Sequence, residues 1–120
     1  LGGGLGAIAR YLINEYTTEL LIKYTKIVFP YGTFLSNVIG SLLIGIAFGV
    51  FRECIANNKS LELFIIVGIL GGFTTFSSFS LEINNMLQAG EYLSSIIYII
   101  SSIIIALLFT FLGVKISSFF

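Results

Sequence analysis

Charged residues divide this chain into long apolar segments. Residues 27–51, 63–81 and 92–114 contain no Asp, Glu, Lys or Arg and are 25, 19 and 23 residues long. Because a helix needs about 20 apolar residues to cross the hydrocarbon core of a bilayer, each segment predicts a membrane-spanning helix.

The first 22 residues are less uniform, because Arg10, Glu15 and Glu19 interrupt them. Apolar side chains still recur there at helical spacing, so we interpret this segment as a fourth span. The connections between spans are short and leave no room for a domain outside the membrane. The predicted fold is one all-α transmembrane domain, residues 1–120, with spans at about 1–22, 27–51, 62–86 and 92–115.

Composition narrows the function. Hydrophobic residues make up 57% of the chain and charged residues 10%, and six basic residues balance six acidic ones. Without a basic field, binding to nucleic acid is not expected. The chain has no His and a single Cys, Cys54, which excludes a His or Cys metal cluster, a Ser-His-Asp triad and an internal disulfide. We therefore do not expect an enzyme, and we interpret Cys54 as a reduced thiol without a function.

The sequence also predicts an assembly of several copies. Four helices of this length make a poor pore alone, and basic residues are nearly balanced between the two ends of the predicted bundle, which is typical of proteins that insert in both orientations. Close helix packing is predicted by two pairs of glycines four residues apart, Gly2 with Gly6 and Gly45 with Gly49.

Polar residues inside the apolar segments are the most informative feature, because they are costly in hydrocarbon unless they are satisfied. Thr33, Asn37 and Ser41 recur every four residues and therefore share a face of the second span. They either join helices by hydrogen bonds or, in the case of the Asn37 amide, donate to an anion.

The third span contains an unusual run, residues 68–80, with paired glycines, five hydroxyl residues and three phenylalanines. Gly71 and Gly72 followed by Thr74 and Thr75 weaken helix propagation, so we expect a break in mid-span. Carbonyl groups freed at such a break can coordinate a cation.

Phe73, Phe76 and Phe79 recur every three residues beside these hydroxyls. The stripe either packs between helices or presents positive ring edges to a small anion. Weak binding of this kind favours conduction, because a tightly held ion does not leave. In the fourth span, Ser102 and Thr110 share a face and could continue a hydrogen-bonding track.

Together these motifs resemble the Fluc (CrcB) family of fluoride channels. The resemblance covers nearly the whole chain, and its most specific part is the run that follows the paired glycines. The residues that carry it are Gly6-Ala7, Arg10-Tyr11, 32–34, 37–40, Gly45, 71–80 and Glu82.

The resemblance implies an antiparallel, dual-topology homodimer of four-helix subunits with a broken third helix. Such a channel, in the cell inner (plasma) membrane, passively exports fluoride from the cytoplasm and so protects against its toxicity. Phe76 and Phe79 would be the ring-edge pair beside fluoride, with Asn37 as the amide donor. The backbone carbonyls of Gly71 and Thr74 from both subunits would hold a structural Na+. The route would be completed by Ser77, Ser102 and Thr110, with Arg10 in the vestibule.

One position departs from the family pattern, which has hydroxyls four residues apart in the fourth span. Here Ala106 stands between Ser102 and Thr110 and interrupts the track. One alternative is therefore a subunit of a heterodimeric fluoride channel. The others are a small multidrug-resistance-type exporter, which needs a carboxylate deep in the first span, and a purely structural subunit.

Overall fold

The computed structural model describes residues 1–53 and 57–119, so Cys54 lies outside the described residues. Within those ranges the chain forms helices and no strands. The helices are α1 (Gly2–Thr25), α2 (Tyr31–Glu53), α3 (Lys59–Glu62), the π-helical η1 (Leu63–Leu70), α4 (Gly71–Phe73), α5 (Phe76–Gln88) and α6 (Tyr92–Ser117).

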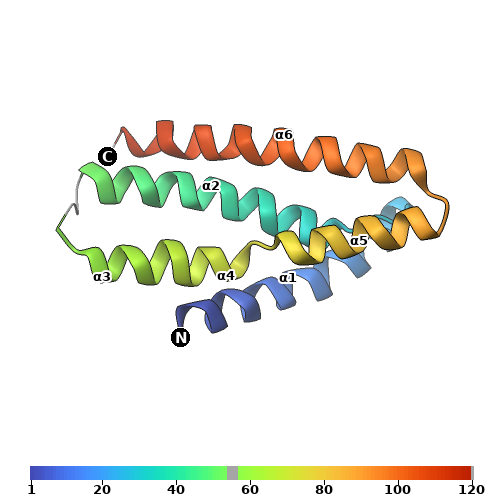
Figure 1. Cartoon of the computed structure of the whole chain (residues 1–120), viewed down its shortest axis with the longest axis horizontal. Helices are drawn as coiled ribbons and strands as arrows, with labels where there is room; N and C mark the ends of the chain where they lie inside the picture. The colour runs from blue at the N-terminus through green and yellow to red at the C-terminus, as the bar shows by residue number, and fades with distance from the viewer. Residues whose placement is uncertain (54–56, 120) are drawn as a thin grey trace.

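The helices run side by side along the long axis of the molecule, which measures 50 × 28 × 25 Å (Figure 1). Segments α3, η1, α4 and α5 follow one another as a single interrupted rod. Both chain ends lie toward the end of the bundle where α2 stops and α3 starts. The chain therefore runs along the bundle in four passes: α1, α2, the rod from α3 to α5, and α6. The long dimension is close to the thickness of a bilayer with its headgroups, about 40–45 Å.

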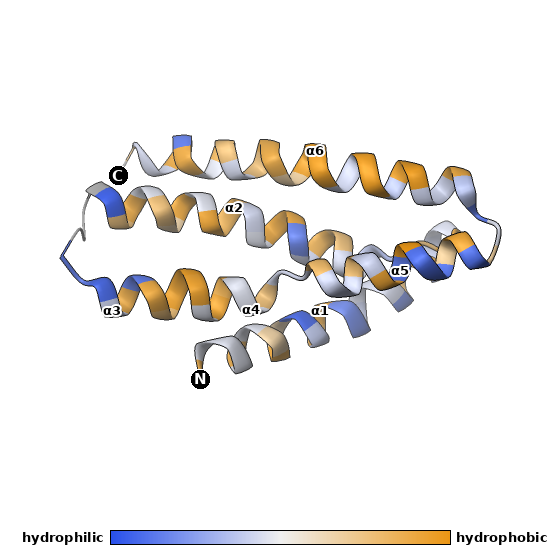
Figure 2. Cartoon of the chain, in the orientation of Figure 1, coloured by the Kyte–Doolittle hydropathy of each residue, from blue (hydrophilic) through white to orange (hydrophobic). Residues whose placement is uncertain are grey.

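Among the described residues, three helical stretches are long and apolar enough to cross a membrane: Tyr31–Arg52, Lys59–Gln88 and Tyr92–Ser117. Figure 2 shows apolar residues along these stretches and hydrophilic ones mainly toward their ends. The chain is thus a multi-pass, all-α membrane protein. Helix α1 has 24 residues, enough to cross, but Arg10, Glu15 and Glu19 lie along it, and its place as a span stays a prediction.

Glycines set the closest helix contacts inside the chain. A Cβ at Gly45 would strike the backbone of α6 at Thr110 and Gly113, and one at Gly6 would lie 2.7 Å from the Phe73 nitrogen. A larger side chain at either position would push the helices apart. Both predicted glycine pairs therefore lie at helix contacts, and these contacts are within one chain.

The α1–α2 junction is stabilised by a side chain from the preceding helix. The backbone N–H of Gly32, in the first turn of α2, donates to Thr18 Oγ1 of α1 at 2.9 Å. The first N–H groups of a helix have no partner in their own helix, so this bond satisfies one of them. It also fixes where α2, and with it Asn37, starts relative to α1.

Candidate functional site at the helix break

The predicted break in the third span is present. Helix α4 stops at Phe73, Thr74 and Thr75 are extended (ψ 156° and 123°), and α5 starts at Phe76. The Ser78 N–H donates to Thr75 Oγ1 at 3.2 Å, so Thr75 caps the new helix.

The paired glycines do not form the break itself. Gly71 and Gly72 are helical, and a Cβ on Gly72 would lie 2.9 Å from the Gly3 Cα of α1. Gly72 thus lets α1 approach, whereas the chain leaves the helix at the two threonines. Threonine is also a poor helix former, because its β-branched side chain loses freedom in a helix.

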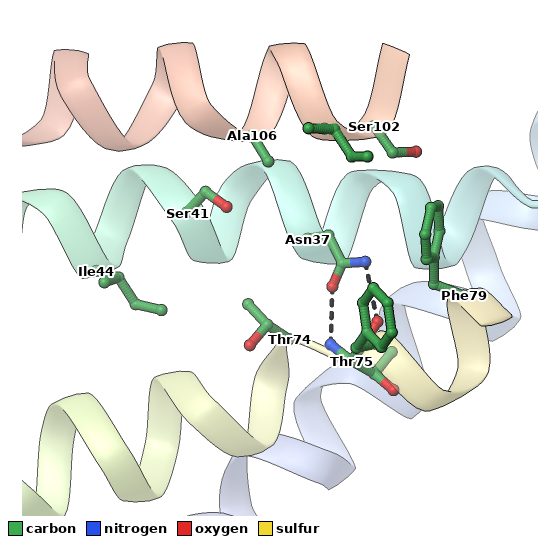
Figure 3. A pocket seen from close by; sticks show the side chains of 10 residues that line it. Asn37, Ser41, Ile44, Thr74, Thr75, Phe79, Ser102 and Ala106 are labelled. Atoms are coloured by element: carbon green, nitrogen blue, oxygen red, sulfur yellow. Dashed lines mark hydrogen bonds between the residues drawn. The ribbon is translucent and has the colours of Figure 1, made fainter. Parts of the chain in front are cut away.

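The carboxamide of Asn37 bridges α2 and the break. Asn37 Nδ2 donates to the Thr75 carbonyl at 3.1 Å, and the Thr75 N–H donates to Asn37 Oδ1 at 2.8 Å (Figure 3). Asn37 therefore satisfies the peptide groups that the break exposes. An amide nitrogen carries two hydrogens. Within the described residues the second one makes no hydrogen bond, so one donor remains for a ligand.

A pocket of about 280 Å³ lies beside this bridge, between α2, the break, α5 and α6 (Figure 3). It brings together five of the predicted site residues. Its lining is Asn37, Ser41, Ile44, Thr74, Thr75, Phe76, Phe79, Ser102, Ile103 and Ala106.

The Ser102 hydroxyl is the clearest unpaired polar group in the pocket. Ser102 is 7% exposed, and its Oγ has no hydrogen-bond partner among the described residues. Thr110, by contrast, donates to the Ala106 carbonyl of its own helix at 3.0 Å. Burying a hydroxyl without a hydrogen-bond partner costs about 1–3 kcal/mol of stability, and a hydrogen bond to a ligand in the pocket would restore it.

The phenylalanine stripe divides into three different environments. Phe73 is buried beside Gly40. Phe79 is 6% exposed and packs on Tyr98 with ring centroids 5.0 Å apart. Phe76 is 77% exposed and lies 5.7 Å from Phe79, with the rings tilted by 44°. Two of the three rings therefore reach the pocket, and Phe76 lies on its open side.

A single carboxylate, held by two hydroxyl groups, lies next to Phe79. This arrangement was not anticipated from the sequence. Thr33 Oγ1 donates to Glu82 Oε1 at 2.6 Å, and the Tyr98 hydroxyl donates to Glu82 Oε2 at 2.7 Å. Glu82 makes no ion pair with any described residue. Two hydroxyls from two other helices thus hold this carboxylate in place. In the sequence, Glu82 stood out only as an acidic residue near the end of an apolar segment and as one of the residues that carry the family resemblance.

The chain matches a known protein family over nearly its whole length. The family profile described as "CrcB-like protein, Camphor Resistance (CrcB)" matches residues 1–114. The chain belongs to the CrcB family.

Relatives of this CrcB chain are similar over nearly their whole length. A protein of Flavobacterium psychrophilum is 43% identical over 117 residues, covering 98% of this chain and 91% of its own. Proteins of Francisella philomiragia and Magnetococcus marinus are 40% and 36% identical, with 86% and 89% of their lengths covered. Each of the three is named "Fluoride-specific ion channel FluC".

Four predicted site residues of the CrcB chain lie outside the pocket lining. The Ser77 hydroxyl is 3.2 Å from Thr75 Oγ1, next to the break. Thr110 lies two helical turns beyond Ser102 on α6, and Arg10 is half-buried on α1. Gly71 is exposed, and its carbonyl accepts only the Thr74 hydroxyl, at 3.5 Å, outside the regular helix bonds of the described chain.

Proposed function

We propose that this chain is a fluoride-selective channel through which cytoplasmic fluoride leaves the cell passively, which lowers its concentration and gives fluoride resistance. The observation that carries the proposal is the pocket at the break, where donors meet without a cationic side chain. One N–H of Asn37 and the Ser102 hydroxyl are free to bind an anion there. The names of the three relatives indicate that the anion is fluoride.

The chemistry of the pocket suits fluoride. Fluoride is small and strongly hydrated, so its path has to replace water with several donors of moderate strength. Asn37 and Ser102 offer an amide and a hydroxyl, and Phe76 and Phe79 offer the positive edges of their rings. None of these holds a full positive charge that would trap the anion.

The remaining predicted residues extend the route on either side. Ser77, in the first turn of α5, and Thr110, two turns beyond Ser102 on α6, would add hydroxyls on either side of the pocket. Arg10 would attract anions into a vestibule. Its guanidinium would act through charge at a distance, because Arg10 does not line the pocket.

A second copy in the antiparallel orientation is part of the proposal. Phe76, on the open side of the pocket, is 77% exposed in one chain, and a partner would close that side. The near-balance of basic residues between the two ends of the bundle supports insertion in both orientations. A homodimer then has two equivalent pathways.

We expect the backbone at the break to contribute to a structural Na+ site. The Thr74 carbonyl accepts no hydrogen bond from the described residues, and Gly71 accepts one long bond, so both oxygens are available. Oxygen atoms of unwound backbone are suitable ligands for Na+. Two carbonyls from one chain are too few, so the partner's break would supply the others. The ion would add positive potential at the centre of the dimer.

Fluoride efflux from liposomes that contain only this purified chain tests the proposal. An ion-selective electrode records fluoride, and chloride-loaded liposomes serve as the control. Fast efflux of fluoride without chloride supports a fluoride channel built from one kind of chain. Absence of efflux from folded protein contradicts the homodimer. Co-reconstitution with a second CrcB-family chain then separates a heterodimeric channel, which regains efflux, from the exporter.

A further inference from the structure

Helices α2 and α6 run in the same direction and pack with a fixed register. Gly45 contacts the Thr110 carbonyl, and Gly49 contacts Ser117, which are 65 and 68 positions further along the chain. Neither contact leaves space for a larger side chain, so the register cannot slide. A Cβ at Gly45 would also lie 3.1 Å from the Gly113 Cα, so a residue of α2 lies level with the α6 residue about 68 positions later.

This register interleaves the pocket residues of the two helices. Asn37 lies between the levels of Ser102 and Ala106, and Ser41 lies between the levels of Ala106 and Thr110. Asn37, Ser41, Ser102 and Ala106 line the pocket. Figure 3 shows Ser41 and Ala106 on neighbouring turns of α2 and α6. The polar wall that α6 contributes stops at the Ala106 methyl group for one turn, about 6 Å of helix.

Ser41 carries a free hydroxyl beside the stretch of α6 between Ser102 and Thr110, where Ala106 has none. Serine in a helix often donates to the carbonyl four residues earlier, as Ser101 does to Ile97 at 2.6 Å. Ser41 makes no such bond within the described residues, and no dashed line reaches it in Figure 3. One turn further on, Gly45 has no side chain and Thr110 has a hydroxyl. Between Asn37 and Gly45, Ser41 is the one hydroxyl residue that α2 carries.

We propose that Ser41 is a pathway residue that substitutes for the missing hydroxyl at Ala106, so that the anion route crosses from α6 to α2 at this level and returns at Thr110. This inference rests on the proposed fluoride conduction. It assigns to α2 a second donor beyond Asn37. It also explains how a track interrupted on one helix can stay continuous in the pocket.

The test is fluoride efflux from liposomes for five chains: the unchanged protein and the variants Ser41→Ala, Ser41→Thr, Ser41→Ala with Ala106→Ser, and Ser101→Ala. We expect Ser41→Ala to slow efflux about tenfold, because the route loses one hydrogen-bond donor to the ion. Ser41→Thr keeps the hydroxyl and should stay near the original rate. The double variant moves the hydroxyl to α6 and should recover most of the flux. Ser101→Ala is the matched control, because Ser101 lies on α6 but does not line the pocket.

The outcomes separate this inference from the proposed function. If the unchanged protein conducts and Ser41→Ala conducts as fast as Ser101→Ala, the role of Ser41 is wrong while the channel stands. If Ser41→Ala is slow and Ala106→Ser does not restore it, Ser41 acts by packing and the substitution of one hydroxyl for the other is wrong. If the unchanged protein does not release fluoride, the proposed function itself fails, and this inference fails with it. Gel filtration of each variant in detergent confirms that it is folded.

Discussion

Asn37 and Thr75 exchange two hydrogen bonds. The Asn37 side-chain Nδ2 donates to the Thr75 carbonyl at 3.1 Å, and the Thr75 N–H donates to Asn37 Oδ1 at 2.8 Å. The side chain that offers a donor to the pocket therefore also holds the third span in its broken form. A change at Asn37 affects ligand binding and the geometry of the break together. Separate measurements of fluoride flux and of stability distinguish these two effects.

Replacing Asn37 with Asp keeps the acceptor for the Thr75 N–H but removes the donor and adds a negative charge. We expect Asn37→Asp to stop fluoride efflux, because a like charge in the path repels the anion, and to lower stability by about 1–3 kcal/mol. Liposome efflux and thermal unfolding in detergent measure the two effects.

The matched control for this change is Asn58→Asp. Asn58 caps α3 by accepting from the Leu61 N–H at 3.1 Å, a role that aspartate also fills. Normal conduction by Asn37→Asp would mean that Asn37 only joins helices.

The two pocket rings should respond differently to the same substitution. We expect Phe76→Ile and Phe79→Ile both to abolish fluoride flux while the dimer still assembles, because the ring edge is lost. Only Phe79→Ile should also destabilise the fold, by about 1–3 kcal/mol, since Phe79 is buried against Tyr98 and Phe76 is exposed. Efflux, cross-linking and thermal unfolding report the three properties.

Phe111→Ile provides the control for these variants, because Phe111 is an exposed ring on α6 away from the pocket. It should conduct and unfold like the unchanged protein. Full flux through both Phe76→Ile and Phe79→Ile would remove the ring edges from the mechanism.

The hydrogen bond from Tyr98 to Glu82 predicts that replacing Tyr98 lowers the stability of the fold. Tyr98→Phe leaves Glu82 Oε2 without its donor in a buried place, and we expect a loss of about 1–3 kcal/mol in the free energy of unfolding. Tyr92→Phe, at the exposed start of α6, should change stability by less than about 0.5 kcal/mol. Equal unfolding temperatures for the two variants would contradict the bond between Tyr98 and Glu82.

The contact of α2 with α6 predicts a large effect of one methyl group. A Cβ at Gly45 meets the α6 backbone at Thr110 and Gly113, so Gly45→Ala should destabilise the bundle by about 3 kcal/mol or prevent folding. Gly4 of α1 has open space around it, and Gly4→Ala should be neutral or slightly stabilising. Thermal unfolding of both variants in the same detergent tests the contrast, and similar melting would show that the register is loose.

Much of the fold follows from where charges are absent. The apolar segments 27–51, 63–81 and 92–114 gave three spans because length and hydropathy alone set the requirement for crossing a bilayer. The break was also predictable, but its position was not. Glycines and threonines both weaken a helix, and only the packing of α1 on Gly72 shows which of them stay helical.

The site was less predictable, because its contacts depend on the register between helices. Sequence spacing placed Thr33, Asn37 and Ser41 on one face, but it could not give three different partners to that face. Thr33 bonds a carboxylate, Asn37 bonds the break, and Ser41 stays free in the pocket. Glu82 is 49 residues from Thr33, so nothing local pointed to their bond.

The two extended threonines have an electrostatic consequence of their own. Each helix carries partial negative charge at its carboxyl end and partial positive charge at its amino end. At Thr74 and Thr75 the carboxyl end of α4 and the amino end of α5 stand next to each other at mid-depth of the third span. One short interruption thus creates a place that favours a cation and a place that favours an anion. Neither place requires a charged side chain in the hydrocarbon, and a continuous helix through these two residues would remove both.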